Sequence, residues 1–214
     1  MPPKDEKKGG NLMKPEPAIR LACQEDVPAL HGLIEKSVRV LQANDYTSKQ
    51  IEGALGTLLG VDTKLISDQT YFVVEALDSS GVLIIVGCGG WSKRKTLFGA
   101  DRRQQRDDEL LNPAVDAAKI RAFFVHPQWA RRGIGTKILE TCEDAAIAAG
   151  FHKFELGATL TGVRLYRNRG YESQEQVDVP MENGEKLQVV IMTKEAPRML
   201  KKLDRSLERK SLIT

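Results

Sequence analysis

Residues 119–150 read KIRAFFVHPQWARRGIGTKILETCEDAAIAAG. The segment from Ile120 to Val125 is almost continuously apolar, which is typical of a strand buried on both faces. The dipeptide His126-Pro127 ends this strand, because proline has no N–H to give to a β-ladder. A helical pattern then begins at Ile134, and Gly150 is well placed to end it. The predicted apolar stripe of that helix comprises Ile134, Ile138, Leu139, Cys142, Ala145, Ala146 and Ala149.

The short loop before the helix, Arg131-Arg132-Gly133-Ile134-Gly135-Thr136, has the features of an anion site. The first turn of a helix presents unpaired N–H groups and the positive end of a dipole, which favour phosphate. Glycines let a ligand approach the backbone closely, and the two arginines add positive charge. We therefore predict a phosphate or pyrophosphate site; the alternative is a basic loop with two turn glycines. Neither the Walker loop nor the dinucleotide fingerprint fits, because no Gly-Lys-Ser/Thr follows and a third glycine is missing.

Two blocks of this sequence resemble a known family. Phe123-Phe124-Val125-His126-Pro127, followed by the loop 131–136, resembles the acetyl-CoA-binding motif of the Gcn5-related N-acetyltransferases (GNAT superfamily). Leu165-Tyr166-Arg167-Asn168-Arg169-Gly170-Tyr171 is similar to the segment that closes the family's cofactor site. The resemblance spans residues 17–194 and departs at Ala130, where the family often has glutamine or arginine.

The resemblance implies a fold of the α/β class (α+β type). It would be a single GNAT-like domain, with a mixed central sheet and helices on both faces. Within the sheet, a parallel strand pair would splay apart, and this pair corresponds to residues 120–125 and 153–159.

The resemblance also implies acetyl-CoA as co-substrate, bound in the cleft between the splayed strands. A bulge in the first strand would free backbone N–H groups to polarise the thioester, and Tyr166 would be the general acid that protonates the departing thiolate. From the residues alone, the strand positions would be ordinary core residues. The implied cofactor-binding residues are Phe123, Phe124, Val125, Arg131, Arg132, Gly133, Ile134, Gly135, Thr136, Thr159 and Arg167. Of these, Thr159 stands where many relatives carry an asparagine.

The acceptor would be an amine, and the candidate acceptor residues are Tyr46, Trp91 and Arg94. Tyr46 lies between the first two predicted helices, a region that borders the acceptor site in the family; simple packing is the alternative. Arg94 follows Trp91 in a long polar insertion, where a lid could bind an acceptor carboxylate. The identity of the acceptor stays open among amino acids, polyamines, aminoglycoside-like amines and protein N-termini.

No general base can be assigned from the sequence. Glu75 and Glu155 lie inside predicted strands and Asp116 lies just before one, so each is also explained as a surface or ion-paired carboxylate. His126 precedes a proline, which favours a role in the turn. Cys142 falls on the buried stripe of the helix and is interpreted as a core residue.

Composition and charge favour a globular protein acting on small molecules. The 214 residues carry a net charge of +3, but residues 1–20 and 194–210 together hold +6 and leave −3 for the remainder. The folded body is thus not the basic surface expected for DNA or RNA binding. No segment is apolar and long enough to cross a membrane, and the N-terminus lacks the apolar region of a signal peptide.

Three cysteines in no metal or redox spacing argue against both a metal site and a disulfide framework. We therefore expect a cytoplasmic protein, and a homodimer is possible because relatives are often dimers.

Along the chain, we expect a disordered tail at 1–17, an N-acetyltransferase domain at 18–195 and a basic C-terminal helix or tail at 196–214. The domain is predicted to contain a strand at 19–21, a helix at 25–39, a second helix after Ser48 and a hairpin at 71–77 and 82–91. An insertion at 92–118 is predicted to be mobile and solvated. A strand at 153–159, a short helix at 162–169 and a hairpin at 171–179 and 187–193 complete the domain.

These inferences favour an acetyl-CoA-dependent N-acetyltransferase that works by direct attack of a primary amine, of a small molecule or a peptide, on the thioester. The first alternative is a non-catalytic acyl-CoA-binding regulator. A third possibility is a structural partner protein that acts through its basic tails.

Overall fold

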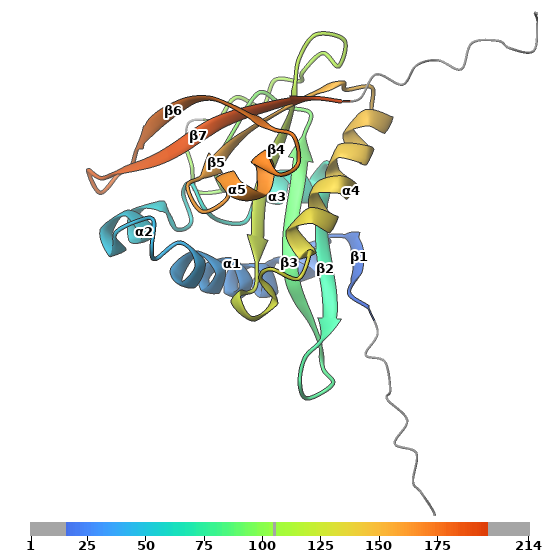
Figure 1. The fold of residues 1–214 in the computed structure, drawn as a ribbon, viewed down its shortest axis with the longest axis vertical. Coiled ribbons are helices and arrows are strands. Elements are labelled where there is room, and N and C mark those ends of the chain that lie inside the picture. The colour runs from blue at the N-terminus through green and yellow to red at the C-terminus, as the bar shows by residue number, and fades with distance from the viewer. Residues whose placement is uncertain (1–15, 105, 197–214) are drawn as a thin grey trace, which may run out of the picture.

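The computed structural model describes residues 16–104 and 106–196, which form a seven-stranded sheet with helices on both faces (Figure 1). The predicted tail and C-terminal helix lie almost entirely outside these residues. The strands are β1 (Ala18–Leu21), β2 (Tyr71–Leu77), β3 (Leu83–Ser92), β4 (Ala118–Val125), β5 (Lys153–Thr159), β6 (Glu172–Pro180) and β7 (Lys186–Glu195). The α-helices are α1 (Val27–Leu41), α2 (Ser48–Ala54), α3 (Thr63–Ser67), α4 (Ile134–Ala148) and α5 (Val163–Arg167), with 3₁₀ turns η1 (Gln24–Asp26) and η2 (Pro127–Trp129).

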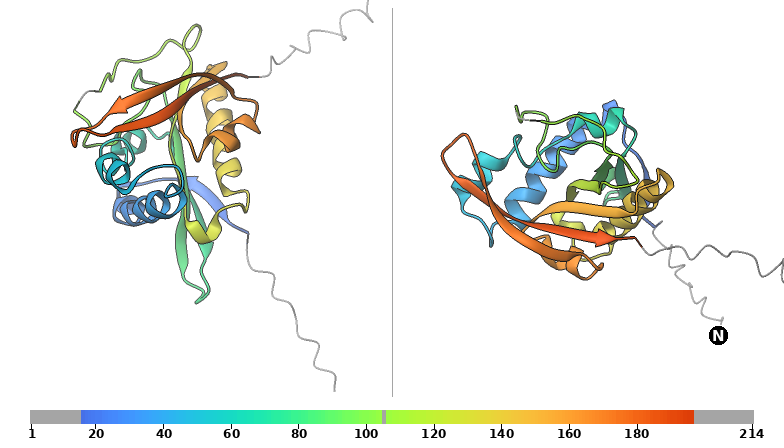
Figure 2. Two further views of the ribbon diagram at one scale, coloured as in Figure 1. Left: turned by 60° about the vertical axis from the view of Figure 1, so that its left-hand side comes forward. Right: turned by 90° about the horizontal axis from the view of Figure 1, so that it is seen from above.

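The sheet has the strand order β1-β2-β3-β4-β5-β7-β6, and its one parallel pair is β4 with β5. Helices α1 and α2 cover one face, whereas α4 and α5 cover the other (Figure 2). A separate apolar cluster fills each of these two layers. The fold class predicted from the resemblance, including the mixed sheet with helices on both faces, is confirmed.

Strand β4 contains the predicted bulge. Against β3, Phe124 pairs with Cys88 and Arg121 with Gly90, so two residues of β4 lie opposite Gly89 alone. The first of these two, Ala122, has a left-handed φ of 54°. Beyond Lys119 no residue of β4 pairs with β5, so the two parallel strands separate there. The cleft predicted between them is therefore present.

Helix α4 lies close against β3 because β3 has glycines, which lack side chains, where it contacts the helix. A Cβ atom on Gly87 would lie 2.5 Å from the side chain of Ile134, and one on Gly89 would lie 2.7 Å from both Ile138 and the Phe123 ring. The predicted stripe of α4 is buried at Ile134, Ile138, Leu139, Cys142 and Ala146. Ala149 differs from the prediction, because it follows the last helical residue and is exposed.

The opposite layer is built by α1 and by the shorter helix α2. Thr47 caps α2 by accepting a hydrogen bond from the Gln50 N–H. The helix ends at Ala54, and Gly56, with φ of 81°, turns the chain back. Leu55, Leu58 and Leu59, which repeat at helical spacing after Ile51, thus lie in a turn and not in the helix.

The insertion 92–118 is packed against the domain over part of its length rather than solvated throughout. Asp62, with 0% exposure, lies 3.0 Å from an Arg106 nitrogen and 2.7 Å from Arg121 of β4. The Asp101 carboxylate accepts hydrogen bonds from both the N–H and the hydroxyl of Thr63. These bonds hold the insertion against the start of α3, where Asp62 and Thr63 lie.

We predict that the substitution Asp62→Asn destabilises the protein by about 3–5 kcal/mol, because it leaves a buried guanidinium without its counter-charge. Urea unfolding measures this loss. The matched control is Glu52→Gln, which breaks the exposed ion pair with Arg39 and should leave the unfolding midpoint nearly unchanged. Similar midpoints for the two variants would contradict the structural role of Asp62.

Candidate active site

The loop that precedes α4 exposes a run of backbone N–H groups. The first hydrogen bond of the helix runs from the Lys137 N–H to the Gly133 carbonyl, at 2.9 Å. In the part of the chain that the structure describes, no acceptor is found for the six N–H groups of residues 131–136. Arg131 and Gly133 both have left-handed φ values, 62° and 82°, which curl the loop over the start of the helix.

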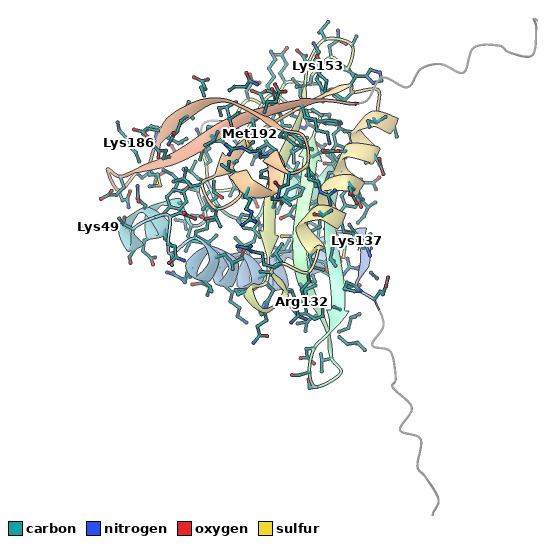
Figure 3. The ribbon with its side chains drawn as sticks, viewed as in Figure 1. Lys49, Arg132, Lys137, Lys153, Lys186 and Met192 are labelled. Carbon is teal, nitrogen blue, oxygen red and sulfur yellow. The ribbon has the colours of Figure 1, made fainter. Side chains whose placement is uncertain are left out.

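Positive charge surrounds this loop. The Arg132 guanidinium lies over the Trp129 ring, 5.1 Å from its centroid, and Figure 3 places Arg132 beside the first turn of α4. The loop thus combines free N–H groups, the positive end of a 15-residue helix and adjacent arginines, all of which favour anions. This arrangement suits a phosphate or a pyrophosphate.

The edge of β4 that faces the cleft also offers backbone donors. The His126 N–H donates to the Val86 carbonyl of β3, at 2.8 Å, whereas the Val125 N–H points the other way and donates to Ser37 Oγ, at 3.3 Å. Successive residues of a strand direct their N–H groups to opposite sides. The Val125 N–H therefore lies on the cleft edge of β4, where Ser37 accepts it, and Phe123 of the bulge also lines the cavity.

A cavity of about 220 Å³ passes through the gap between β4 and β5 and reaches both layers of helices. On the α4 side its walls include Gly135, Leu165 and Tyr166. On the α1 side they include Leu41, Gln42, Leu58 and Leu59. The remaining lining residues are Ser37, Gly60, Leu97, Phe98, Gly99, Ile120–Val125, Gly157, Thr159, Thr161, Gly162, Val179, Leu187 and Val189.

Tyr166 is held rigidly in the wall of this cavity. Its ring packs edge-on against Phe123 and Tyr171, with centroid separations of 6.1 and 5.8 Å. Its hydroxyl has no hydrogen-bond partner among the described residues. Burial raises the pKa of this phenol above its ordinary value of 10, so it stays protonated at neutral pH. Tyr166 is thus placed to donate a proton into the cavity.

Two polar residues of the wall were not found by sequence reasoning. Arg121 is buried and donates to the Thr96 and Gly99 carbonyls, at 2.9 and 2.6 Å, in addition to its ion pair with Asp62. Gln42 ends α1, and its side-chain Oε1 is buried without a hydrogen-bond partner in the described chain. Both depend on contacts between distant segments, and no local motif marks them.

The residues predicted for cofactor binding fall into two groups. Phe123, Phe124, Val125, Gly135 and Thr159 line the cavity. The second group forms the loop beside the cavity and comprises Arg131, Arg132, Gly133, Ile134 and Thr136. Arg167 belongs to neither group. The Arg167 side chain is exposed on α5 and lines no part of the cavity.

The three residues predicted for the acceptor wall lie elsewhere. The Trp91 ring is buried edge-on against Phe151, in the α4 layer. The Arg94 guanidinium makes two hydrogen bonds with the Asp68 carboxylate, at 2.7 and 2.8 Å, and does not reach the cavity. Neither residue is among those that line the cavity.

Tyr46 has a bridging position instead of forming a cavity wall. Its hydroxyl donates to the Gln188 carbonyl, at 2.7 Å, and accepts from the Leu160 N–H, at 2.8 Å. Burial raises the pKa of this phenol to about 12. Tyr46 thus ties the turn after α1 to the ends of β5 and β7, and both of its hydrogen-bonding functions are used.

The carboxylates considered as general bases are engaged away from the cavity. Glu75 pairs with Arg20, at 2.6 Å, Glu155 pairs with Lys119, and Asp116 accepts from the Asn112 N–H, at 2.7 Å. No aspartate or glutamate is among the residues that line the cavity. Burial lowers the pKa of His126, whose Nδ1 accepts from the Gln128 N–H in the turn.

In the described residues, no three His, Cys, Asp or Glu side chains are grouped to hold a metal ion. None of the helices found there combines the length and the apolar character that a membrane span requires.

Solved structures with the same fold are N-acetyltransferases. A GCN5-related N-acetyltransferase from Rhodopseudomonas palustris is 22% identical, with a TM-score of 0.61, over 87% of this chain and 99% of that one. The PaiA N-acetyltransferase from Thermoplasma acidophilum, solved with coenzyme A, is 14% identical, with a TM-score of 0.54, over 84% and 99%. YncA, a putative acetyltransferase from Salmonella typhimurium solved with acetyl-CoA, is 18% identical, with a TM-score of 0.53, over 86% and 95%.

The sheet that opens between β4 and β5 and the loop before α4 define a GNAT-type domain. The model of the acetyltransferase (GNAT) family matches residues 43–171, and the chain belongs to this family. No curated protein matches the chain significantly.

We predict that Tyr46→Phe lowers the free energy of unfolding by about 1–3 kcal/mol, because it leaves the partly buried Leu160 N–H and Gln188 carbonyl without their partner. Thermal unfolding measures the change. Tyr166→Phe is the matched control, since its hydroxyl has no protein partner, and its melting temperature should stay close to that of the wild type. A drop of the same size in both variants would contradict the bridging role of Tyr46.

Proposed function

We propose that this protein transfers an acetyl group from acetyl-CoA to a primary amine, of a small molecule or a peptide, by direct attack. The observation that carries the proposal is the cavity itself. It joins the anion-binding loop at Gly135 to the protonated hydroxyl of Tyr166, along the free edge of β4. Membership of the acetyltransferase family and the coenzymes bound in the two structural neighbours support this reading.

The residues of the site fit coenzyme A in two places. The N–H groups of 131–136, with Arg131 and Arg132, would hold the pyrophosphate. The main chain of Phe123 and Val125, which lines the cavity, would hold the amide-rich arm and the thioester carbonyl, and the Val125 N–H would exchange Ser37 Oγ for the ligand. Bound acetyl-CoA supplies an activated acetyl thioester.

The reaction forms a C–N bond, breaks a C–S bond and moves one proton from nitrogen to sulfur. A backbone N–H at the carbonyl oxygen would stabilise the negative charge that develops there. Tyr166 would give its proton to the departing sulfur and regain one from the amide nitrogen through solvent. Every step uses groups that line the cavity.

Direct attack is favoured because none of the described cysteines reaches the cavity. Cys142 and Cys88 are fully buried, and burial raises the pKa of both thiols. Cys23 is exposed, beside Asp26, before α1. A double displacement through an acetylated cysteine therefore has no nucleophile at the site.

We predict that Gly133→Asp weakens acetyl-CoA binding at least tenfold more than Gly133→Asn. Asparagine and aspartate both tolerate the left-handed φ of 82°, and an added Cβ meets no atom within 4 Å. The pair therefore differs by one negative charge at the helix start, which would repel the pyrophosphate. Isothermal titration with acetyl-CoA measures both affinities, and equal affinities would exclude this loop as the pyrophosphate site.

We predict that Tyr166→Phe lowers kcat by about 10²-fold, because the variant has no proton to give to the sulfur. Its affinity for acetyl-CoA should be unchanged. Because burial raises the pKa of Tyr166, deprotonation of this phenol should cause no fall in wild-type kcat between pH 7 and 9. Thiol release with an amine panel measures the rates. A variant as active as the wild type would refute the acid role, and a protein that binds acetyl-CoA but acetylates no amine would be a regulator instead.

A further inference from the structure

The insertion between β3 and β4 supplies one wall of the cavity. Leu97, Phe98 and Gly99 of this insertion all line it. Phe98 is half-buried and packs against the apolar cluster on the α1 side of the sheet. The loop that suits the coenzyme lies at the start of α4, which covers the other side. An acceptor that meets the thioester in the gap would therefore approach from the side on which Phe98 lies.

The Phe98 ring lies against β5, at a position where that strand has no side chain. A Cβ atom on Gly157 would lie only 2.9 Å from Phe98 Cδ1. The neighbours of this glycine, Leu156 and Ala158, belong to the cluster on the α4 side, so Gly157 faces the α1 side. The ring thus fills the space over Gly157, beside the gap between β4 and β5.

Contacts on its other side fix this ring in place. The Arg103 guanidinium lies over it, 5.0 Å from the ring centroid. The carbonyls of Thr96 and Gly99, one on each side of the Leu97-Phe98 pair, accept hydrogen bonds from Arg121, at 2.9 and 2.6 Å. Because Arg121 directly precedes the bulge of β4, the position of the ring is linked to the strand that would hold the thioester.

The same segment is also bonded to the chain that follows α2. The Ala100 N–H donates to the Thr57 carbonyl, at 2.7 Å, and the Asp101 N–H donates to the Val61 carbonyl, at 3.0 Å. Two neighbouring elements therefore hold the segment, through main-chain and side-chain hydrogen bonds. A wall that is held in this way limits the size of whatever binds beside it.

The cavity is small for the two substrates that it would hold. Its volume is about 220 Å³. Pockets for drug-sized ligands typically measure ~300–1,000 Å³. The same space would contain the acetyl thioester as well as the acceptor, so the room that is left suits a small amine.

We propose that Phe98 sets the upper size limit of the acceptor: its ring closes the α1 side of the cavity over Gly157, so that small primary amines fit and amines with a bulky distal group do not. This inference rests on the proposed acetyl transfer and names the size class of its acceptor. Phe98 contributes shape and no reacting group. Truncating it should therefore improve the use of large amines, whereas the loss of a merely structural ring would impair the use of every amine.

The test compares butylamine with 4-phenylbutylamine. Calorimetric titrations into the CoA-loaded protein report binding, and thiol release from acetyl-CoA reports turnover. The wild type should favour butylamine at least tenfold in both. Phe98→Ala should shift the preference toward 4-phenylbutylamine at least tenfold, in Kd and in kcat/KM, with the Kd of acetyl-CoA unchanged. Phe98→Leu, which keeps a branched apolar side chain, should shift it in the same direction by a smaller factor.

The matched control is Leu110→Ala, in the same insertion. Leu110 is 59% exposed and lines no part of the cavity, so this variant should keep the wild-type preference. An equal shift in Leu110→Ala would overturn the inference. If Phe98→Ala is unfolded at the assay temperature by circular dichroism, Phe98→Leu decides alone.

Each outcome separates the inference from the function on which it rests. If the Phe98 variants keep the wild-type preference, the inference fails, whereas acetyl transfer stands if either amine is acetylated. If the preference shifts in binding but no thiol is released, the inference stands and the proposed function fails. A wild type that binds 4-phenylbutylamine as well as butylamine, or binds neither, overturns the inference.

Discussion

Strand β4 carries a single left-handed residue, Ala122, in the stretch where it has separated from β5. A non-glycine residue at φ of 54° is strained by about 1–2 kcal/mol and persists only where its surroundings hold it. Here the fully buried Tyr71 hydroxyl donates to the Ala122 carbonyl, at 3.2 Å, and the preceding Arg121 is fixed by Asp62 and two carbonyls. Burial also raises the pKa of Tyr71, so the donor keeps its proton. The bulge is thus held by hydrogen bonds and an ion pair on the side of the sheet that carries α1.

The same irregularity organises both sides of the cleft. Gly89, opposite the bulge, leaves room for the Phe123 ring, and that ring in turn packs against Tyr166. On the far lip, Tyr46 joins Leu160 to Gln188 across segments that are distant in the sequence. These contacts are hydrogen bonds and close packing between side chains of the protein itself. The gap between β4 and β5 is therefore formed without a ligand.

The sequence could predict the parts of the site that are local. The loop and α4 are contiguous, so their spacing and glycines identify the anion site, and a bulge follows from the resemblance. Side-chain direction was harder: a strand pattern alone did not show that Trp91 faces the α4 layer, and Arg94 finds Asp68, 26 residues earlier. The sequence also does not show that Gln42 Oε1 is buried without a hydrogen-bond partner, because this depends on which groups distant segments place beside it. Helix α3, with five residues, is too short to show a helical period.

A cavity lined by no carboxylate is chemically consistent with acetyl transfer to an amine. An alkylamine with a pKa near 10.4 lies about 3.4 units above pH 7, so its deprotonation costs roughly 4.6 kcal/mol in water. A carboxylate at the site would stabilise the ammonium and would also repel the negative charge that develops on the thioester oxygen. Walls without a carboxylate avoid both effects, because they desolvate the ammonium and leave the amine neutral. In this site the burial of the amine would therefore take the place of a dedicated base.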